Sequence, residues 1–466
     1  MRKIFEAESV AVIGASDRPG NLGRTILQNL IDWGYRGKIY AVNPRGGEAL
    51  GIPLHAAVED LPEAPDLAVA IVPAPALPGV MRDCGRKGID RVAIPSGGFE
   101  ELGGEGRELQ EEIKRVAGSF GMRFVGPNCL TVINAHTGLC LPFVPVPPYL
   151  KRGGVSIIAQ SGGIGLDLLV RLYSENTGFS KFVSTGNKAD LDEVDYLEYL
   201  GSDPDTEVIC LYLEDVQRGR RLLQTVKDID KPVLVLKSNV TPLARGSAVS
   251  HTAALANDDQ VLDAALRQAG AMRVDGLREL AGLAKAFALP PLKGNRVALV
   301  SPTGGLLVLA ADRCARHGFE FPPLKEDLER EIAGRLHAGV INISNPVDLG
   351  DVHDPASRLF IVDRLLAQDY IDGVILVLIS RMSADPSAFS TGGLKDAQRS
   401  LVPELAEACR RHGKPLVFGL LANDLARFNA RRSADFPIFA DADEAVDAAA
   451  ALRDWWRFRH GKKRAD

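Results

Sequence analysis

Residues 9–23 read Ser9-Val-Ala-Val-Ile13-Gly14-Ala-Ser-Asp-Arg-Pro-Gly20-Asn-Leu-Gly23, an apolar run followed by a glycine-rich turn. An amphipathic stretch then continues to about Trp33. The apolar run predicts a buried strand, and the amphipathic stretch predicts a helix. A glycine turn between the two leaves backbone N–H groups free at the helix N-terminus, where they favour a phosphate group. We therefore expect an α/β unit with an anion site at the carboxyl end of its first strand.

The same alternation of strand and helix patterns continues beyond this unit. Apolar runs separated by amphipathic or charged stretches are typical of parallel strands joined by helical crossovers. The sequence therefore predicts a doubly wound parallel sheet in this part of the chain. The expected strands are Ser9–Ile13, Lys38–Val42, Asp66–Val72, Arg91–Ile94 and Arg123–Val125, with helices at Ala76–Lys87 and up to Ala117.

The second expected strand ends in Asn43-Pro44-Arg45. A fold that binds NAD offers an acidic residue to the ribose at this place, and its first turn has the spacing GxGxxG. Neither feature is present here, so a nicotinamide-dependent oxidoreductase is disfavoured, and NADH binding by the first domain would revive that reading. An arginine at this position suits a phosphorylated ribose.

The rest of the chain contains an internal duplication. One unit begins at Gly153 with an apolar strand and the turn Gln160-Ser-Gly-Gly163, and another begins at Gly294 with a strand and the turn Ser301-Pro-Thr-Gly-Gly305. Self-similarity of this kind indicates two copies of one arrangement, and the order of strands and helices predicts two flavodoxin-like, doubly wound domains. The matched segments are Val183–Leu191 with Ile341–Leu349, Val208–Leu213 with Val374–Ile379, and Lys231–Val235 with Lys414–Phe418.

The two copies differ where chemistry is expected. At the end of its third strand the first copy has Glu214, whereas the second has no carboxylate there. The first copy also has a long loop, Lys237–Asp259, that carries His251 and ends in a capping-box pattern of Asn257 and Gln260. A neutral imidazole is a nucleophile toward phosphorus when a carboxylate holds its second nitrogen, and we predict that role for His251 with Glu214. A single histidine is also compatible with an ordinary polar loop residue.

Glycine-containing turns precede a helix in both copies. Gln160, Ser161 and Gly162 form the first of these turns, and Gly304 and Gly305 belong to the second. Two helix N-termini directed at one phosphate would each favour its negative charge by about 1 kcal/mol or somewhat more when desolvated. We therefore regard both turns as candidate phosphate sites. Glycines in these positions are also compatible with tight packing of a strand against a helix, without any ligand.

Several of these segments resemble the NDP-forming acyl-CoA synthetases, the family of the ADP-forming acetyl-CoA synthetases and of succinyl-CoA synthetase. The segment around Ser250-His251-Thr252 is similar to the family's phosphohistidine loop, although Ala253 and Ala254 stand where the family often has Gly-Ser. Turns at four strand ends are similar to the family's CoA-binding domain. The residues of these turns are Gly14, Ala15 and Ser16; Asn43, Pro44 and Arg45; Ser96, Gly97 and Gly98; and Asn128 within Gly126–Leu130.

The resemblance implies a Rossmann-like CoA-binding domain at residues 1–130, a flavodoxin-like ligase domain with the phosphohistidine loop at 131–290, and a second flavodoxin-like ligase domain at 291–466. It implies that acyl-CoA, ADP and phosphate are interconverted with acid, CoA and ATP, through an acyl phosphate and a phosphohistidine at His251. Glu214 would orient and stabilise the imidazole. The residues that would hold the phosphate are Gln160, Ser161, Gly162, Gly304 and Gly305.

The family also needs a nucleotide-binding ATP-grasp region, and no segment of this sequence resembles one. The resemblance therefore implies a separate ATP-grasp β subunit in an α2β2 heterotetramer, with ADP or ATP and Mg on that partner. The changes at Ala253, Ala254 and the third-domain turn leave open an alternative, a catalytically inactive regulatory protein that binds CoA or acyl-CoA. No residue pattern identifies the acyl group.

Composition narrows the remaining function classes. The 466 residues carry a net charge of −5, so no basic surface for nucleic acid is expected. No apolar run is long enough to span a membrane and the start lacks the apolar core of a signal peptide, so we expect a cytoplasmic protein. The six cysteines have no CxxC spacing, and no His, Asp or Glu cluster has metal-ligand spacing, so neither disulfides nor a metal site is expected.

Overall fold

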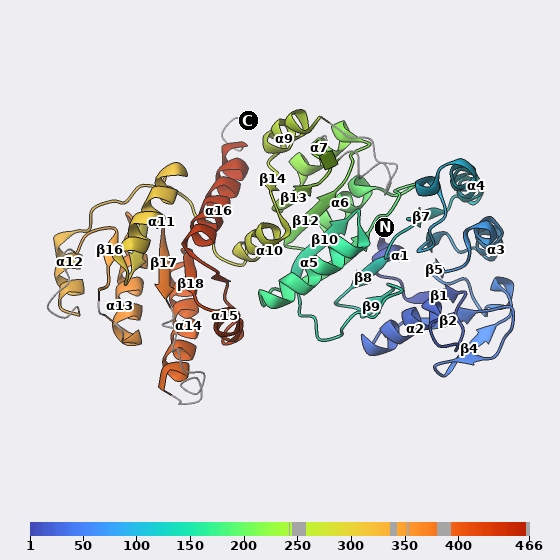
Figure 1. Cartoon of the computed structure of the whole chain (residues 1–466), viewed down its shortest axis with the longest axis horizontal. Helices are drawn as coiled ribbons and strands as arrows, with labels where there is room; N and C mark the ends of the chain where they lie inside the picture. The colour runs from blue at the N-terminus through green and yellow to red at the C-terminus, as the bar shows by residue number, and fades with distance from the viewer. Residues whose placement is uncertain are drawn as a thin grey trace. The chain divides into compact units, whose positions relative to one another are not determined.

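The computed structural model describes residues 1–241, 243–244, 258–335, 343–350, 352, 354–379 and 393–462 (Figure 1). The chain divides into two compact units. Unit 1 consists of Met1–Val170 with Gly178–Leu280, and unit 2 consists of Arg171–Thr177 with Ala281–Asp466. The division into three domains that the sequence suggested stays a prediction, since two of the three sheets lie within unit 1.

The first sheet of unit 1 has the strand order of a Rossmann-like domain. Its order is β3-β4-β2-β1-β5-β6-β7, and all neighbours are parallel except β3 with β4. Without the short strand β3, this is a doubly wound order in which the carboxyl ends of β1 and β5 meet at the switch point that binds ligands. The strands are β1 Ser9–Ile13, β2 Lys38–Val42, β3 Glu48–Ala49, β4 Ile52–His55, β5 Leu67–Ala70, β6 Arg91–Ala93 and β7 Arg123–Val125.

Helices cover both faces of this sheet. Successive residues of β1 belong to different apolar cores, because side chains of a strand alternate between faces. Val10 and Val12 pack with α2, whereas Ala11 and Ile13 pack with α3 and α4. All four side chains are buried, so both faces of the central strand are sealed from solvent. The helices are α1 Arg2–Phe5, α2 Leu22–Asp32, α3 Leu77–Lys87 and α4 Gly104–Phe120.

The second sheet of unit 1 has the order β14-β13-β12-β10-β11-β8-β9. Its first five strands are parallel, and β8 and β9 add an antiparallel hairpin at the β11 edge. In chain order the parallel strands run 2-1-3-4-5, the flavodoxin-like order. The elements are β8 Val132–Asn134, β9 Leu139–Cys140, β10 Arg152–Ala159, α5 Gly162–Ser174, β11 Phe179–Ser184, α6 Glu193–Ser202, β12 Val208–Leu213, α7 Gly219–Asp228, β13 Val233–Lys237, α9 Asp259–Ala269, β14 Met272–Val274 and α10 Leu277–Ala286.

The sheet of unit 2 repeats this order. It runs β16-β15-β17-β18-β19 with all neighbours parallel, so the expected α/β class with two flavodoxin-like sheets is confirmed. Helices α11 and α16 pack together, as do α13 and α14. The elements are β15 Val297–Ser301, α11 Gly304–Arg316, α12 Glu326–Ala333, β16 Val347–Asp348, α13 Pro355–Leu366, β17 Gly373–Ile379, α14 Gly393–His412, β18 Leu416–Leu421, α15 Asp424–Arg431, β19 Ile438–Phe439 and α16 Ala442–Lys462.

The start of α9 differs from the expected capping box. Its N-cap is Asp258, whose carboxylate accepts the N–H groups of Gln260 at 3.0 Å and Val261 at 3.3 Å. Asn257, which was predicted to be the cap, lies outside the described residues. An aspartate caps as well as an asparagine and adds a negative charge at the positive end of the helix dipole.

Candidate functional site

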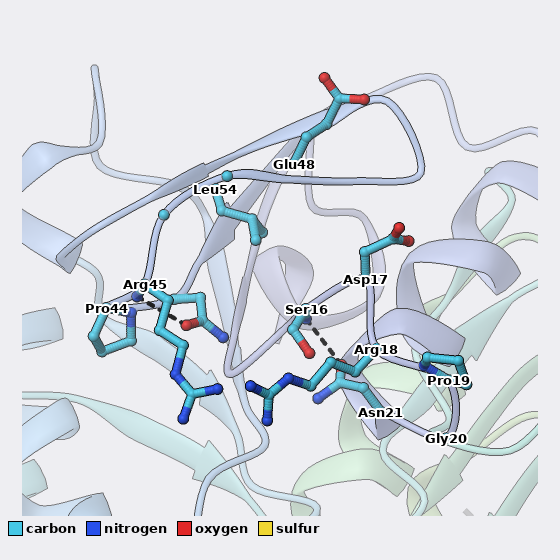
Figure 2. A pocket seen from close by; sticks show the side chains of 13 residues that line it. Ser16, Asp17, Arg18, Pro19, Gly20, Asn21, Pro44, Arg45, Glu48 and Leu54 are labelled. Carbon is cyan, nitrogen blue, oxygen red and sulfur yellow. Dashed lines mark hydrogen bonds between the residues drawn. The ribbon is translucent and has the colours of Figure 1, made fainter.

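A pocket of about 740 Å³ lies at the carboxyl ends of β1 and β2 (Figure 2). This volume is in the range of sites for small molecules and cofactors. Of the residues expected to bind a ligand, Ser16, Asn43, Pro44 and Arg45 line the pocket. The other lining residues are Asp17, Arg18, Pro19, Gly20, Asn21, Gly46, Gly47, Glu48 and Leu54.

Two asparagines hold the turns that form the pocket. Asn21 caps α2, and its Oδ1 accepts the Ser16 N–H at 2.9 Å. Asn43 Nδ2 donates to the Ala15 carbonyl at 2.8 Å, while its Oδ1 accepts the Arg45 N–H at 3.0 Å. The turn after β2 is thereby joined to the turn after β1, so the pocket is formed before a ligand arrives.

Positive charge gathers on one side of the pocket. Arg18 and Arg45 are exposed, and neither forms a salt bridge with any residue in the described part of the chain. In Figure 2 both guanidinium groups extend to the same side of the pocket, and Glu48 lies on the opposite side. Asp17 is paired with Arg24 at 3.1 Å. Together with the positive end of the α2 dipole, the two arginines suit a ligand that carries phosphate groups.

Gly14 and Ala15 shape the pocket without lining it. Gly14 has φ of 97°, and a β-carbon there would lie 2.3 Å from the Ile71 carbonyl oxygen. Only glycine therefore allows the turn after β1 to pass this close to the end of β5. Ala15 is fully buried beneath the turn.

The residues expected at the ends of β6 and β7 lie apart from this pocket. Ser96 Oγ donates to the Val72 carbonyl at 2.6 Å, and the Ser96 carbonyl accepts the Asn128 N–H at 2.9 Å. Asn128 has a left-handed backbone with φ of 58°, and its Nδ2 donates to Asn187 Oδ1 of the second sheet at 3.3 Å. These turns therefore face the second sheet. The residues concerned are Ser96, Gly97, Gly98 and Asn128.

The turn after β11 joins the two sheets of unit 1. The Asn187 N–H donates to the Pro127 carbonyl at 3.0 Å, and the Ala189 N–H donates to the Gly126 carbonyl at 3.1 Å. Gly186 has φ of 57°, and a β-carbon there would lie 2.2 Å from the Pro127 carbonyl oxygen. Main-chain hydrogen bonds thus hold the carboxyl edges of both sheets against each other.

Gln160, Glu214 and the start of α5 lie together at the carboxyl edge of the second sheet, because β10 and β12 are neighbours. Gln160 Oε1 accepts the N–H groups of Glu214 at 2.9 Å and Asp215 at 3.1 Å, and its Nε2 donates to Asp215 Oδ1 at 2.6 Å. Ser161 and Gly162 follow directly, and α5 begins at Gly162. The side chain of Gln160 is buried and serves the Glu214–Asp215 turn.

His251 lies outside the described residues, as does the rest of 245–257. The strand that leads to this segment, β13, ends beside Glu214. Lys237 at its end is buried, and its Nζ donates to the Glu214 carbonyl at 2.8 Å. Burial lowers the pKa of Lys237 below that of an ordinary lysine. Strand β13, which precedes the histidine segment in the chain, thus ends next to the backbone of Glu214.

Gly304 and Gly305 begin α11 of unit 2 and are exposed. No side-chain hydrogen bond caps this helix among the residues that the structure describes. A β-carbon on Gly304 would lie 3.5 Å from the Asp348 carboxylate, so an acidic side chain stands beside the helix start. The corresponding Asp190 of the second sheet is instead paired with Arg123 at 2.9 Å. Both helix starts thus have a carboxylate residue close by, Asp348 at α11 and Glu214 at α5.

Arg18, Lys188 and Asp215 were not among the site residues predicted from the sequence. Each stands in or beside a turn that had been singled out, and this proximity was the available signal. A charged residue beside a turn is usually solvated, however, and its partners come from other segments. Their positions could not be anticipated without the packing of the sheets.

Within the described ranges, no three His, Cys, Asp or Glu side chains come together in a way that could hold a metal ion. No helix in those ranges is long and apolar enough to cross a membrane. All six cysteines are buried and unpaired, and burial raises the pKa of Cys84 to about 12. A thiol with such a pKa is a poor nucleophile at neutral pH.

Two protein-family models match the chain. A CoA binding domain matches residues 8–135, which hold the first sheet and its pocket. A succinyl-CoA ligase like flavodoxin domain matches residues 152–287, which hold the parallel strands of the second sheet.

Similar proteins match along the whole chain. The α subunit of ADP-forming acetate–CoA ligase I from Pyrococcus furiosus is 32% identical, over 99% of this chain and 100% of its own length. ADP-forming acetate–CoA ligase I from Archaeoglobus fulgidus is 36% identical over 97% of this chain and 63% of its own length. The solved structure of Ca. Korarchaeum cryptofilum dinucleotide-forming acetyl-coenzyme A synthetase 1, in complex with phosphate and ADP, matches with a TM-score of 0.88 and 29% identity, covering 100% of this chain and 98% of that one.

Proposed function

Since the chain belongs to the ADP-forming acyl-CoA synthetases, we propose that it is the α subunit of an enzyme of the acetate–CoA ligase type. The protein is an acid–thiol ligase, and CoA is one of its substrates. The observation that carries the proposal is the match over the full length of both chains to a relative that is named as an α subunit. The relatives are named as ligases and synthetases, so the alternative of a catalytically inactive CoA-binding protein is not supported.

The proposed reaction proceeds in three group transfers. A phosphate oxygen attacks the carbonyl carbon of acyl-CoA, and the CoA thiolate leaves and takes up a proton. His251 then attacks the phosphorus of the acyl phosphate, and the carboxylate of the acid leaves. The phosphohistidine finally transfers its phosphoryl group to ADP, which restores the imidazole and forms ATP. The reverse sequence makes acyl-CoA.

We assign the adenosine end of CoA to the pocket of the first sheet. This part of CoA carries a diphosphate and a 3′-phosphate, and the pocket offers Arg18, Arg45 and the N-terminus of α2. Arg45 lies in the turn that follows β2. A fold that binds NAD has an acidic residue at this place. The charge of Arg45 therefore suits the 3′-phosphate, and the Gly14–Ser16 turn suits the diphosphate. The turns at Ser96–Gly98 and Asn128, which face the second sheet, are assigned to the thioester end.

Arg45→Gln is expected to weaken CoA binding about 10-fold or more while leaving dephospho-CoA binding nearly unchanged. A charge-assisted hydrogen bond to phosphate contributes about 1.5–3 kcal/mol. Dephospho-CoA has no 3′-phosphate and cannot form this bond, so the change should not affect its binding. Titration calorimetry with both ligands measures the two affinities. Arg86→Gln is the matched control, since Arg86 is an exposed arginine of α3 that pairs with Asp83 and does not line the pocket. An equal loss for both ligands would contradict the assignment of Arg45 to the 3′-phosphate.

We assign Ser161 and Gly162 to the phosphate that reacts at His251. Helix α5 has 13 residues, so its N-terminus offers free N–H groups and the positive end of a full dipole. Gln160 bonds the Glu214–Asp215 turn to this helix start, so its part in the phosphate site is to hold that turn. Glu214 is partly exposed and would accept the second imidazole N–H. Gly304 and Gly305 at the start of α11 stay predicted phosphate residues of unit 2, with Asp348 beside them.

The relatives named as α subunits imply a partner subunit. We propose that it is an ATP-grasp β chain that binds ADP or ATP with Mg2+, in an α2β2 heterotetramer. A cytoplasmic location is proposed as well, since six unpaired cysteines suit a reducing compartment. Co-expression of the two chains should yield a complex by size-exclusion chromatography, and light scattering would give its stoichiometry.

The proposal is tested by incubating the full chain with 32P-labelled inorganic phosphate and a panel of acyl-CoAs. We expect acid-labile label on the chain with acetyl-CoA or a related thioester, and its transfer to ADP when the β subunit is added. The thioester that labels fastest identifies the acyl group. The absence of label and of ATP with every thioester, for both chains together, would overturn the proposed function.

A further inference from the structure

A buried group of charged side chains lies directly behind the Glu214 turn. Lys188 Nζ is 2.6 Å from Asp215 Oδ1 and 3.1 Å from Glu193 Oε2, and it donates to the Asp215 carbonyl at 3.1 Å. The side chains of Lys188, Asp215 and Glu193 are 1%, 11% and 0% exposed. All three N–H bonds of the ammonium group thus have an acceptor within the protein.

Stability alone does not account for this group. Two carboxylates face one ammonium, and taking each ion out of water costs several kcal/mol. The second oxygen of Glu193 has no hydrogen-bond partner in the part of the chain that the structure describes, and burial raises the pKa of this carboxyl. Well-packed apolar side chains of similar volume are often as stabilising as such a group. We therefore consider that the group holds neighbouring residues in position, rather than that it stabilises the fold.

The group holds Asp215 from two sides. Lys188 binds its carboxylate and its carbonyl, and Gln160 Nε2 donates to the same Oδ1 at 2.6 Å. Gln160 Oε1 also accepts the N–H groups of Glu214 and Asp215. Because Ser161 follows Gln160 in the chain, the backbone of Glu214 is fixed relative to the start of α5.

Lys188 also belongs to the turn that is joined to the first sheet. Its backbone is left-handed, with φ of 53°, so its side chain enters the protein from a sharp turn. The preceding Asn187 donates from Nδ2 to Glu101 at 2.6 Å, and Glu101 accepts the Gly98 N–H at 2.6 Å. A continuous set of contacts therefore runs from the turns of the first sheet to Glu214.

We propose that Lys188 is a positioning residue for phosphoryl transfer, which acts through Asp215 to set the Glu214 turn against the start of α5. The inference rests on the proposed function, because Glu214 and the α5 start matter together only if phosphate reacts between them. Lys188 itself does not touch the phosphate, since it is buried and its N–H bonds are all used. Its effect is on the geometry of the reacting groups.

The test compares Glu193→Gln with the double variant Lys188→Met/Glu193→Gln in the full chain. The double variant removes one positive and one negative buried charge, so Asp215 keeps its bond to Gln160 and the net charge of the group is unchanged. The probes are 32P-labelled phosphate and acetyl-CoA, or whichever thioester labels the wild-type chain. Rapid quench gives the rate of phosphoenzyme formation at each thioester concentration.

Glu193→Gln is expected to label within about 2-fold of the wild-type rate, because it keeps the Lys188–Asp215 contacts. The double variant is expected to label about 100-fold more slowly, the loss that a misplacement near 1 Å causes. Its half-saturating thioester concentration and its CoA affinity should stay unchanged, since the CoA pocket is formed by other turns. A loss of rate without a loss of CoA affinity distinguishes a positioning role of Lys188 from general damage to the fold.

Equal labelling rates in the two variants would overturn the inference, and so would a double variant that loses CoA affinity in proportion to rate. No labelling of the wild-type chain, alone or together with the β subunit, would instead count against the proposed function. Gln160→Met provides an independent test if the double variant does not fold, because it releases the same turn from the other side. We expect a similar loss of rate from Gln160→Met, and no multiplication of the losses when the changes are combined. Fully multiplicative losses would contradict a shared turn.

Discussion

Replacing His251 by alanine is expected to abolish phosphoenzyme formation. In the proposed reaction the imidazole is the group to which phosphorus becomes covalently attached, and alanine offers no nucleophile. We expect a fall of at least about 1,000-fold in acyl-CoA-dependent ATP formation, since removing a nucleophile from a catalytic group commonly costs more than that. Acid-labile 32P on the purified chain, measured with and without the change, gives the result directly.

Binding of CoA should survive this change. The pocket of the first sheet is formed by the turns after β1 and β2. His460→Ala is the matched control, because His460 is an exposed histidine on α16 whose ring stacks on Trp456. We expect His460→Ala to label like the wild-type chain. A His251→Ala chain that still acquires acid-labile label would remove His251 from the mechanism.

Lys285→Met is expected to destabilise unit 2 by about 3–5 kcal/mol, the cost of removing one partner from a buried charged group. The side chain of Lys285 is 2% exposed. Its Nζ bonds to Glu175, lies 3.0 Å from Glu444 and donates to the Ile438 carbonyl at 2.9 Å. The ammonium also lies 4.7 Å from the centre of the Phe439 ring. Denaturant unfolding of the wild-type and variant chains measures the difference in free energy.

The same variant makes a prediction about pH. Burial by itself raises the pKa of Glu444, but attraction to Lys285 and hydrogen bonds outweigh it, so the pKa lies below that of an ordinary glutamate. A carboxyl with a depressed pKa in the folded state stabilises above its unfolded value, near 4.3, and loses that contribution as pH falls through the folded value. Without Lys285 the pKa of Glu444 rises, so the difference between wild type and Lys285→Met should be full at pH 7 and shrink as the pH falls from the variant's pKa through the lower pKa of the wild type.

Lys114→Met is the control for the Lys285 experiment. Lys114 pairs with Glu111 at 2.8 Å on the surface of α4, with 43% of its side chain exposed. Exposed pairs contribute about 0–1 kcal/mol, so this change should alter stability little at any pH. A Lys285→Met chain that unfolds like Lys114→Met would show that the buried pairs of unit 2 contribute no more than a surface pair.

Sequence patterns predicted the helices and strands well where neighbouring residues determine the backbone conformation. The strands Val208–Leu213 and Arg123–Val125 have the predicted limits, because a run of apolar side chains between turns leaves little choice of backbone. The glycine turn after β1 was also recognised, and Gly14 requires its positive φ. The duplication predicted the same strand order in two sheets, and both sheets have it. The hairpin β8–β9 received no prediction, since its two short strands are stabilised by pairing with β11.

Site residues were predictable only in part, for a related reason. Arg45 was recognised because it stands at the end of a strand, where a nicotinamide-binding fold has an acidic residue. Arg18 was not recognised, since its turn reads like any polar loop until the turn after β2 is placed opposite it. The amide of Gln160 bonds to the Glu214–Asp215 turn, and its expected place at the phosphate stays a prediction. The roles of Glu214 and His251 stay predictions.

The sequence by itself determined the α/β class, the duplicated domain and the family of the chain, because periodicity, turn glycines and short motifs are properties of neighbouring residues. The tertiary structure alone decided which side chains share a buried site. Lys188, Glu193 and Asp215 come from two turns and a helix start, and only the adjacency of β10, β11 and β12 brings them together. A buried ion needs its partner within about 4 Å. That distance is set by packing between segments, which residue order does not record.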